Sequence, residues 1–303
     1  MPAADRTVPL VPRRRLVGLS FGGLTSARRG PGSDVAGSRP YSPGDDVDTI
    51  DWNASARLSS ARGTDEFIVR EKFAEEAPRV VVVADRRPEM DVFPPWLPWL
   101  SKPQAMAHAA DILFEAAIAS RGISGYLDFA DGEAFWRPPR AQHDDLDLRD
   151  RSIFGAPRDT VGRSLQFLVE HRRALPTGSF VFVLSDFLDP PPAEAWTRVL
   201  QQRWDVVPVV IQDPVWEQNF PPIGGVVVPF WDPRKRRVMP VRLTAAEAAA
   251  RRDEHQERFT RSIASLRAYE LEPVVLSSDD RGEIFQSFID WAELRRFWRG
   301  RSW

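Results

Sequence analysis

Three continuous runs of mostly β-branched and aromatic residues constrain the fold of this chain more than any other feature. They span residues 79–84, 179–184 and 206–211. Each has the composition of a strand that is buried on both faces of a parallel sheet. Helical patterns lie between them, at residues 103–121, 162–174 and 193–203. Strands that alternate with helices through short connections form a doubly wound, mostly parallel sheet with helices on both faces, so we expect an α/β fold.

Turn and cap signals complete the predicted order of elements. Asp131-Gly132 and Asp232-Pro233 predict two hairpins. Their strands cover residues 124–130, 133–137, 225–231 and 237–243. Thr244 is expected to cap a long helix to residue 269, before a last strand at residues 273–277 and a helix at residues 281–297. We therefore place the α/β domain at residues 79–297.

Composition excludes several classes of function. The formal net charge of −2 over 303 residues argues against a general nucleic-acid-binding surface. The absence of cysteine excludes disulfides, thiol nucleophiles, iron–sulfur clusters and cysteine zinc sites. The longest hydrophobic patch, residues 93–100, is interrupted by three prolines and is too short to cross a bilayer. We expect a cytoplasmic protein that does not bind nucleic acid.

Basic residues are concentrated near both ends. Residues 1–38 are rich in Gly, Pro, Ser and Arg and predict a loop-like or disordered tail. The C-terminus is also basic, through Arg295, Arg296, Arg299 and Arg301. Solvated tails are the favoured interpretation. Binding of an acidic partner or anionic lipid is the alternative, which limits any membrane contact to a peripheral one.

A polar motif connects the tail to the α/β domain, within a segment that we place at residues 39–78. Pro43 and Gly44 suit the central positions of a type II turn. Asp45 or Asp46 then suits the N-cap of a helix. Trp52 lies beside the apolar face of that helix and is expected to anchor it. A strand is predicted at residues 67–70.

The aspartates of this motif have two interpretations. In the first, Asp45, Asp46 and Asp51 converge on a metal ion, and the protein is a metal-dependent hydrolase. In the second, which we favour, the acids cap a helix and hold Arg39, Arg57 or backbone amides. Histidines that would complete a transition-metal site are absent from this stretch of sequence.

Together these features resemble the bacterial family catalogued as domain of unknown function 58, over residues 20–295. The matching motif residues are Arg39, Tyr41, Pro43, Gly44, Asp45, Asp46, Asp51, Trp52 and Arg57. Residues 70–71, 80–85 and 183–187 match as well. The resemblance implies a von Willebrand factor A-like domain from Val80 onward. It also implies work beside a MoxR-type AAA+ ATPase in the assembly or maturation of other complexes.

The resemblance also implies the position of a cation site. In von Willebrand A domains an Asp-x-Ser-x-Ser motif, a later Thr and a later Asp surround a divalent cation. Here Asp85 matches the first Asp, while Arg87 and Glu89 take the two serine positions. Thr160 corresponds to the later Thr and Asp186 to the later Asp.

Arg87 changes what such a site can hold. Its guanidinium keeps its charge in proteins and would repel a divalent cation at close range. We expect Arg87 to bridge Asp85 and Asp186 by hydrogen bonds and to replace the metal. The alternative is a retained Mg²⁺ that uses Glu89. Our hypothesis is therefore a degenerate metal site without a cofactor.

An aromatic, proline-rich loop follows this site. Phe93, Trp96 and Trp99 either dock a protein partner or fold onto their own domain. The sequence contains no Gly-rich phosphate loop, no Gly-x-Ser-x-Gly elbow and no His-Glu-x-x-His motif, so no nucleophile–base constellation is indicated. We therefore expect a non-enzymatic interaction module whose partner is the AAA+ ATPase or its client.

Overall fold

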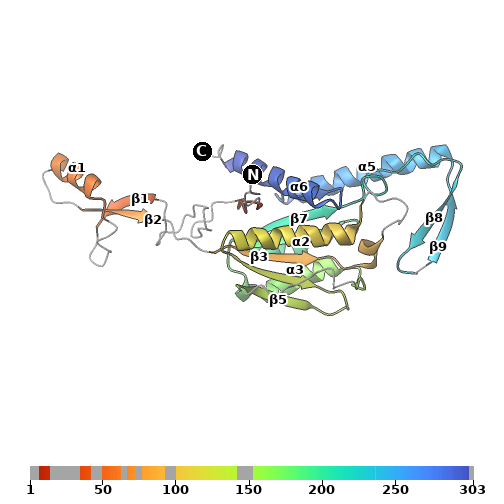
Figure 1. Ribbon diagram of the computed structural model, residues 1–303, viewed down its shortest axis with the longest axis horizontal. Coiled ribbons are helices and arrows are strands. Elements are labelled where there is room, and N and C mark those ends of the chain that lie inside the picture. Colours follow the sequence, from red (N-terminus) through yellow and green to blue (C-terminus); the bar gives the residue numbers. More distant parts are fainter. Residues whose placement is uncertain are drawn as a thin grey trace, which may run out of the picture.

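The computed structural model of the chain describes residues 7–13, 35–41, 50–62, 67–72, 77–92, 100–141, 153–235 and 237–299. Its largest part is a six-stranded sheet with helices on both faces (Figure 1). The strands are β3 (Arg79–Ala84), β4 (Ile123–Asp128), β5 (Phe135–Arg140), β6 (Phe180–Ser185), β7 (Asp205–Ile211) and β10 (Val274–Leu276). The α/β fold predicted from the alternating strands and helices is confirmed.

The strand order is β10-β7-β6-β3-β4-β5, and all neighbours are parallel except β4 and β5. From β3 the chain proceeds outward to β4 and β5, and it then returns to the other side of β3 to add β6, β7 and β10. Such a reversal defines a switch point, where ligands of open α/β sheets bind outside the carboxyl ends of the strands. The switch point here lies between β3 and β6, where Ala84 pairs with Leu184.

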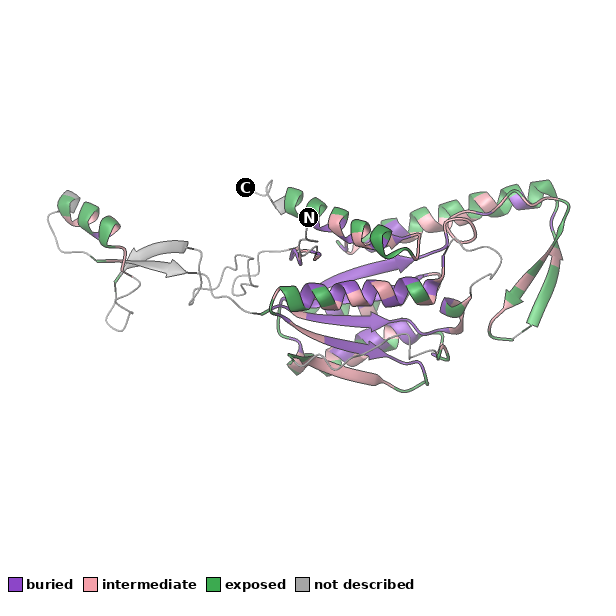
Figure 2. Ribbon diagram, viewed as in Figure 1, coloured by how far each residue is buried: buried purple, intermediate pink, exposed green. Residues whose placement is uncertain are grey.

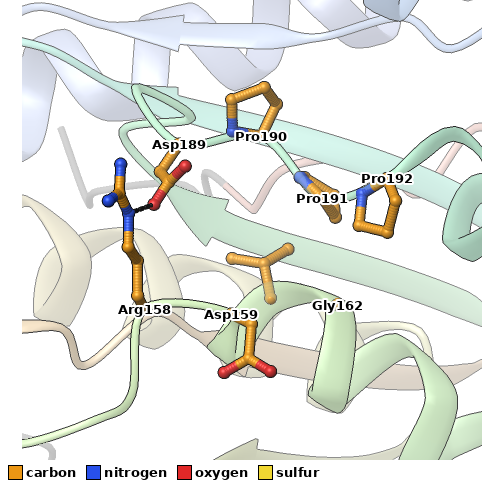
Figure 3. A pocket seen from close by; sticks show the side chains of 8 residues that line it. Arg158, Asp159, Gly162, Asp189, Pro190, Pro191 and Pro192 are labelled. Carbon is orange, nitrogen blue, oxygen red and sulfur yellow. Dashed lines mark hydrogen bonds and ion pairs between the residues drawn. The ribbon is translucent and has the colours of Figure 1, made fainter.

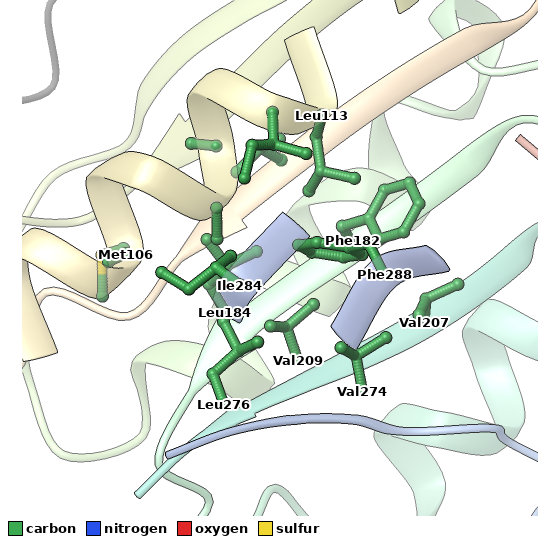
Figure 4. Close-up of a cluster of buried hydrophobic side chains, with 14 of the residues drawn as sticks. Met106, Leu113, Phe182, Leu184, Val207, Val209, Val274, Leu276, Ile284 and Phe288 are labelled. Atoms are coloured by element: carbon green, nitrogen blue, oxygen red, sulfur yellow. The ribbon is translucent and has the colours of Figure 1, made fainter. Parts of the chain in front are cut away.

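Two layers of helices cover the sheet because its side chains alternate between the faces. Val80 and Val82 point to one core cluster, under α2 (Lys102–Ala119) and α6 (Arg281–Arg299). Figure 4 shows Phe288 of α6 and Leu113 of α2 meeting the sheet there. Val81 and Val83 point to the other cluster. It lies under α3 (Thr160–Glu170), α4 (Ala193–Gln201) and the C-terminal half of α5 (Ala245–Ala268).

The predicted hairpins form two different structures. β4 and β5 form an antiparallel hairpin at one edge of the main sheet, and Gly132 in the turn between them has a positive φ of 86°. β8 (Val227–Asp232) and β9 (Arg237–Arg242) form a separate two-stranded sheet. Thr244 caps α5 with a capping box completed by Glu247. Two short 3₁₀ helices, η2 (Pro88–Asp91) and η3 (Arg172–Ala174), complete the described elements.

The motif segment builds a small unit beside this domain (Figure 1). β1 (Val35–Pro40) pairs antiparallel with β2 (Ile68–Lys72), and α1 (Trp52–Arg62) packs against β2. The predicted tail therefore ends too late, because β1 begins within it. The predicted helix start is also wrong: α1 begins after Asp51, whose carboxylate accepts the Ala54 N–H at 3.0 Å. Pro43, Gly44, Asp45 and Asp46 lie outside the described residues.

Both basic ends contain residues that are built into the core, contrary to the prediction of solvated tails. Val8, Leu10 and Val11 are buried in the cluster under α2 and α6. Arg295 is also buried and donates to the Val11 carbonyl at 2.9 Å and to Asp205 at 3.0 Å. Burial of these aliphatic side chains, together with an ion pair, offsets the conformational entropy that the segment loses on ordering.

Candidate functional site

Acidic residues stand at the carboxyl ends of three neighbouring strands of the sheet. Asp128 is the last residue of β4, Asp85 directly follows β3, and Asp186 directly follows β6. All three side chains are buried. The parallel register brings Asp85 and Asp186 to the same level, and the Asp85 N–H donates to the Leu184 carbonyl at 2.9 Å. The carboxyl edge of the sheet at its switch point is therefore acidic.

Arg87 lies between the two central acids. Its Nε donates to both carboxylate oxygens of Asp85, at 3.0 and 2.9 Å. Its Nη2 lies 2.6 Å from Asp85 Oδ2 and 2.6 Å from Asp186 Oδ1. Only 2% of Arg87 is exposed. The guanidinium thus connects β3 to β6 from a position that solvent barely reaches.

Neighbouring donors fix the orientation of this pair. Ser185 donates its hydroxyl to Asp85 Oδ2 at 2.7 Å, and the Leu188 N–H donates to Asp186 Oδ1 at 3.0 Å. The Arg87 N–H also bonds Asp85 Oδ1, at 3.0 Å. Because fully partnered buried charges cost less than unpaired ones, these bonds make the cluster tolerable inside the protein.

A second buried cation completes the centre. Lys102, at the start of α2, donates from Nζ to Asp186 Oδ2 at 3.0 Å and to Glu217. Glu217 in turn accepts the Asp213 N–H at 2.9 Å. Every carboxylate oxygen of Asp85 and Asp186 therefore accepts a hydrogen bond from Arg87 or Lys102.

The two aspartates differ in acidity because only one of them contacts two cations. Burial raises the pKa of Asp85, and the hydrogen bonds from Arg87 oppose this shift without overcoming it. Burial acts on Asp186 in the same direction, but the charges of Lys102 and Arg87 outweigh it and lower the pKa. The surrounding carboxylates raise the pKa of Lys102 and Arg87 despite burial, so both cations stay charged at neutral pH.

A second buried cluster continues the row toward β4. The Tyr126 hydroxyl donates to Asp128 Oδ2 at 2.8 Å, and Arg86 reaches that hydroxyl at 3.3 Å. Burial raises the pKa of Tyr126. The Arg86 guanidinium lies 4.8 Å from the centre of the Phe154 ring. The two consecutive arginines therefore contact different strand ends. Arg86 interacts with residues of β4, and Arg87 with the aspartates that follow β3 and β6.

Of the two other residues predicted for the same centre, Glu89 pairs elsewhere and Thr160 makes no side-chain hydrogen bond to the centre. The carboxylate of Glu89, in η2, pairs with Arg234 of the β8–β9 hairpin, so Glu89 faces away from Asp85. Thr160 is buried at the first turn of α3. Its hydroxyl has no hydrogen-bond partner among the residues that the structure describes. The predicted role of Glu89 is therefore wrong, while that of Thr160 stays a prediction.

Asp51 is the only member of the Asp45, Asp46 and Asp51 group within the described residues, so their convergence on a metal stays a prediction. Asp51 caps α1, and Trp52 is 60% exposed with an edge-on contact to Phe67 at 5.9 Å, so Trp52 is not the expected anchor. Ser55 joins α1 to β2 instead: its hydroxyl accepts the Ile68 N–H at 2.8 Å and donates to the Asp51 carbonyl at 2.7 Å.

The other predicted residues are exposed, lie in β1, or fall outside the described residues. Tyr41 and Arg57 are exposed, and Arg39 belongs to β1. The aromatic loop residues Phe93, Trp96 and Trp99 lie outside the described residues. Within the described ranges, the His, Asp and Glu side chains form no group of three or more suited to a metal ion.

A shallow groove borders the centre. Asp189 lies 4.0 Å from Arg87 Nη1 and pairs with the exposed Arg158. Figure 3 shows these two residues at one end of a pocket of about 250 Å³, with Pro190, Pro191 and Pro192 along its wall. The groove continues between α3 and α4 past Gly162. Asp189 is thus the half-exposed residue that separates the buried centre from this surface.

Comparison with known proteins identifies the family. A family described as Protein of unknown function DUF58 matches residues 37–264. The chain belongs to this family. The matched DUF58 region includes both the motif segment and the ion-paired centre, and it confirms the resemblance noted in the sequence.

Relatives and solved structures extend the comparison. Uncharacterized proteins of Mycobacterium bovis and Mycobacterium tuberculosis are each 28% identical over 232 residues, covering 75% of this chain and 70% of the relative. The conserved hypothetical protein BatB from Bacteroides thetaiotaomicron matches 71% of this chain and 99% of its own, with 16% identity and a TM-score of 0.39. An aerotolerance-related membrane protein from Bacteroides fragilis matches 70% and 99%, with 16% identity and a TM-score of 0.40. Among the helices that the structure describes, none is long and apolar enough to cross a membrane.

Proposed function

We propose that this DUF58 protein is a non-enzymatic interaction module with a von Willebrand factor A-like domain whose cation site has become a permanent ion pair. The observation that supports it is the complete pairing of Asp85 and Asp186 by Arg87 and Lys102. A divalent cation needs several free oxygen ligands. Here each carboxylate oxygen already accepts from a fixed positive charge, so these residues do not fit a metal.

The two side-chain cations link elements of the carboxyl edge, as a bound metal ion would. Arg87 connects the ends of β3 and β6, and Lys102 connects β6 to the start of α2 and to Glu217. The arrangement of the carboxyl edge therefore does not depend on binding of a metal ion. A partner would meet a surface whose shape does not depend on the concentration of Mg²⁺.

Melting temperature in the presence of metal tests the cation replacement. A ligand that binds only the folded state stabilises it by RT ln(1 + [L]/Kd), so a bound cation would raise Tm. Because the wild type offers no free site, about 10 mM MgCl₂ or MnCl₂ should leave its Tm unchanged. Arg87→Ser restores a hydroxyl and removes the charge, and its Tm should rise when Mg²⁺ is added. The matched control is Arg163→Ser, on an exposed pair with Asp159. A Mg²⁺-dependent rise in the wild type would refute the replacement.

We further propose that the partner is a MoxR-type AAA+ ATPase or its client, as the family resemblance suggests. The partner test is separate from the metal test. Co-elution of the full chain with the purified MoxR-type ATPase of the same organism should occur in size-exclusion chromatography with ATP. If both proteins elute independently at about 10 μM each, a complex with a Kd of about 1 μM or below is excluded. That result would overturn the partner and leave the cation replacement standing.

A further inference from the structure

The hairpin of β8 and β9 stands apart from the main sheet, next to the N-terminal end of α5 (Figure 1). We call residues 227–242 the arm. Its register places Val227 opposite Arg242, Pro229 opposite Pro240, and Trp231 opposite Val238. Because side chains alternate along a strand, these three pairs share one face, which we call the outer face of the arm.

The inner face of the arm is anchored. Phe230 and Val241 pack on a cluster formed with Phe220 and Trp216. The rings of Phe230 and Trp216 meet edge to face at 6.2 Å. The strand that carries Phe230 is therefore held in a fixed orientation, and its alternate side chains are presented away from the protein.

The outer face is apolar and uncovered. Trp231 is 48% exposed, Val238 57% and Val227 59%. Pro229 and Pro240 are exposed as well. Figure 2 shows β9 coloured mostly as exposed. Large exposed apolar side chains gathered on one face mark a contact surface.

The two prolines also restrict how the arm can be contacted. Opposed residues in an antiparallel pair either exchange both hydrogen bonds or direct their N–H groups outward. Proline has no N–H, so Pro229 and Pro240 leave a gap in the outward donors on both edges of the arm. Addition of a further strand is thereby disfavoured. A partner must use the outer face.

The arm as a whole is basic, and Arg242 brings positive charge to its outer face. The sequence of the arm contains Arg234, Lys235, Arg236, Arg237 and Arg242 against one acid, Asp232. Arg234 is paired with Glu89, whereas Arg237 and Arg242 are exposed. Among the residues of β8 and β9, the outer face carries no acid. Asp232 lies opposite Arg237 in the register, on the inner face, and its carboxylate pairs with Lys235 at 3.9 Å.

We propose that the outer face of the arm binds an anionic lipid surface. Trp231 and Val238 would enter the boundary between headgroups and acyl chains, and Arg242 would face lipid phosphates. A folded protein fits less well, since a stable interface uses about 20–30 residues a side and the outer face offers only three cross-strand pairs. A membrane requires only apolar area and positive charge. The contact is independent of the proposed ATPase partner.

Vesicle sedimentation with the full chain tests this proposal. The probes are vesicles of phosphatidylcholine alone and of phosphatidylcholine with about 30% phosphatidylglycerol, at about 0.1 M salt. The wild type should pellet with the anionic vesicles only. Trp231→Ser with Val238→Ser, and separately Arg242→Glu, should each reduce binding about tenfold or more.

Controls separate lipid binding from general stickiness or misfolding. Phe297→Ser with Trp298→Ser removes the similarly exposed apolar pair on α6 and should bind like the wild type. Circular dichroism should show that all variants remain folded, as expected for exposed substitutions. Equal pelleting of wild type and arm variants, or no pelleting of the wild type, overturns the proposal. Arm-dependent binding to poly-glutamate in place of vesicles would overturn it in favour of an acidic protein.

Discussion

Removal of the Arg87 guanidinium should destabilise the protein strongly. In Arg87→Met, Asp85 loses the cation that contacts both of its oxygens and keeps only the Ser185 hydroxyl and a backbone N–H. Breaking a buried pair in this way costs about 3–5 kcal/mol. Because 1 kcal/mol shifts Tm by about 2–4 °C in a domain of this size, the expected fall is roughly 6–20 °C. Urea unfolding followed by tryptophan fluorescence measures the free energy.

The same variant should respond to pH in a defined direction. Without Arg87, the pKa of Asp85, which burial already raises, rises further. A raised pKa in the folded state means that protonation favours folding, so the stabilising effect is lost as pH rises through that pKa. The loss caused by Arg87→Met should thus be smaller at about pH 5 than at about pH 8.

A second substitution isolates the interaction. Asp85→Asn in the Arg87→Met background removes the unpaired charge and should recover roughly 1–3 kcal/mol. Arg163→Met, which breaks only the exposed pair with Asp159, should change stability by less than about 1 kcal/mol. A loss of less than about 1 kcal/mol in Arg87→Met, with no dependence on pH, would refute the reasoning.

Three further predictions concern other parts of the molecule. Ser55→Ala removes the hydroxyl that joins α1 to β2, and amide hydrogen exchange should become faster in β2 while the main sheet is unchanged. Arg295→Met leaves Asp205 buried with a backbone donor only and should lower stability by about 3–5 kcal/mol in a urea titration. Trp96→Ala with Trp99→Ala should abolish co-elution with the ATPase without lowering Tm; a large fall in Tm would show that the loop packs on its own domain.

The α/β domain was predictable because its signals are local. A buried parallel strand needs apolar residues on both faces, and the run at residues 79–84 has this composition along its whole length. Position after a strand then placed Asp85 and Asp186 at the same edge of the sheet. Strand order alone explains why residues about 100 positions apart meet.

The rest of the site depends on contacts that no sequence pattern encodes. Lys102 precedes a proline at a helix start and has the appearance of a solvated residue, yet the position of α2 over the sheet brings it to Asp186. Glu217 lies in a loop without a recognisable motif. The helix cap was misplaced because four aspartates compete locally for that position, and only the pairing of Asp51 with Ile68 decides between them.

The contact between Arg295 and Val11 spans 284 residues of sequence. During synthesis, the segment that carries Val11 leaves the ribosome long before the helix that will hold it. Loop closure over such a separation is slow compared with local contacts. Val8, Leu10 and Val11 belong to the same buried cluster as residues of α6, so their burial is complete only once α6 has packed. We therefore expect the packing of the last turns of α6 to be a late step in folding of the domain.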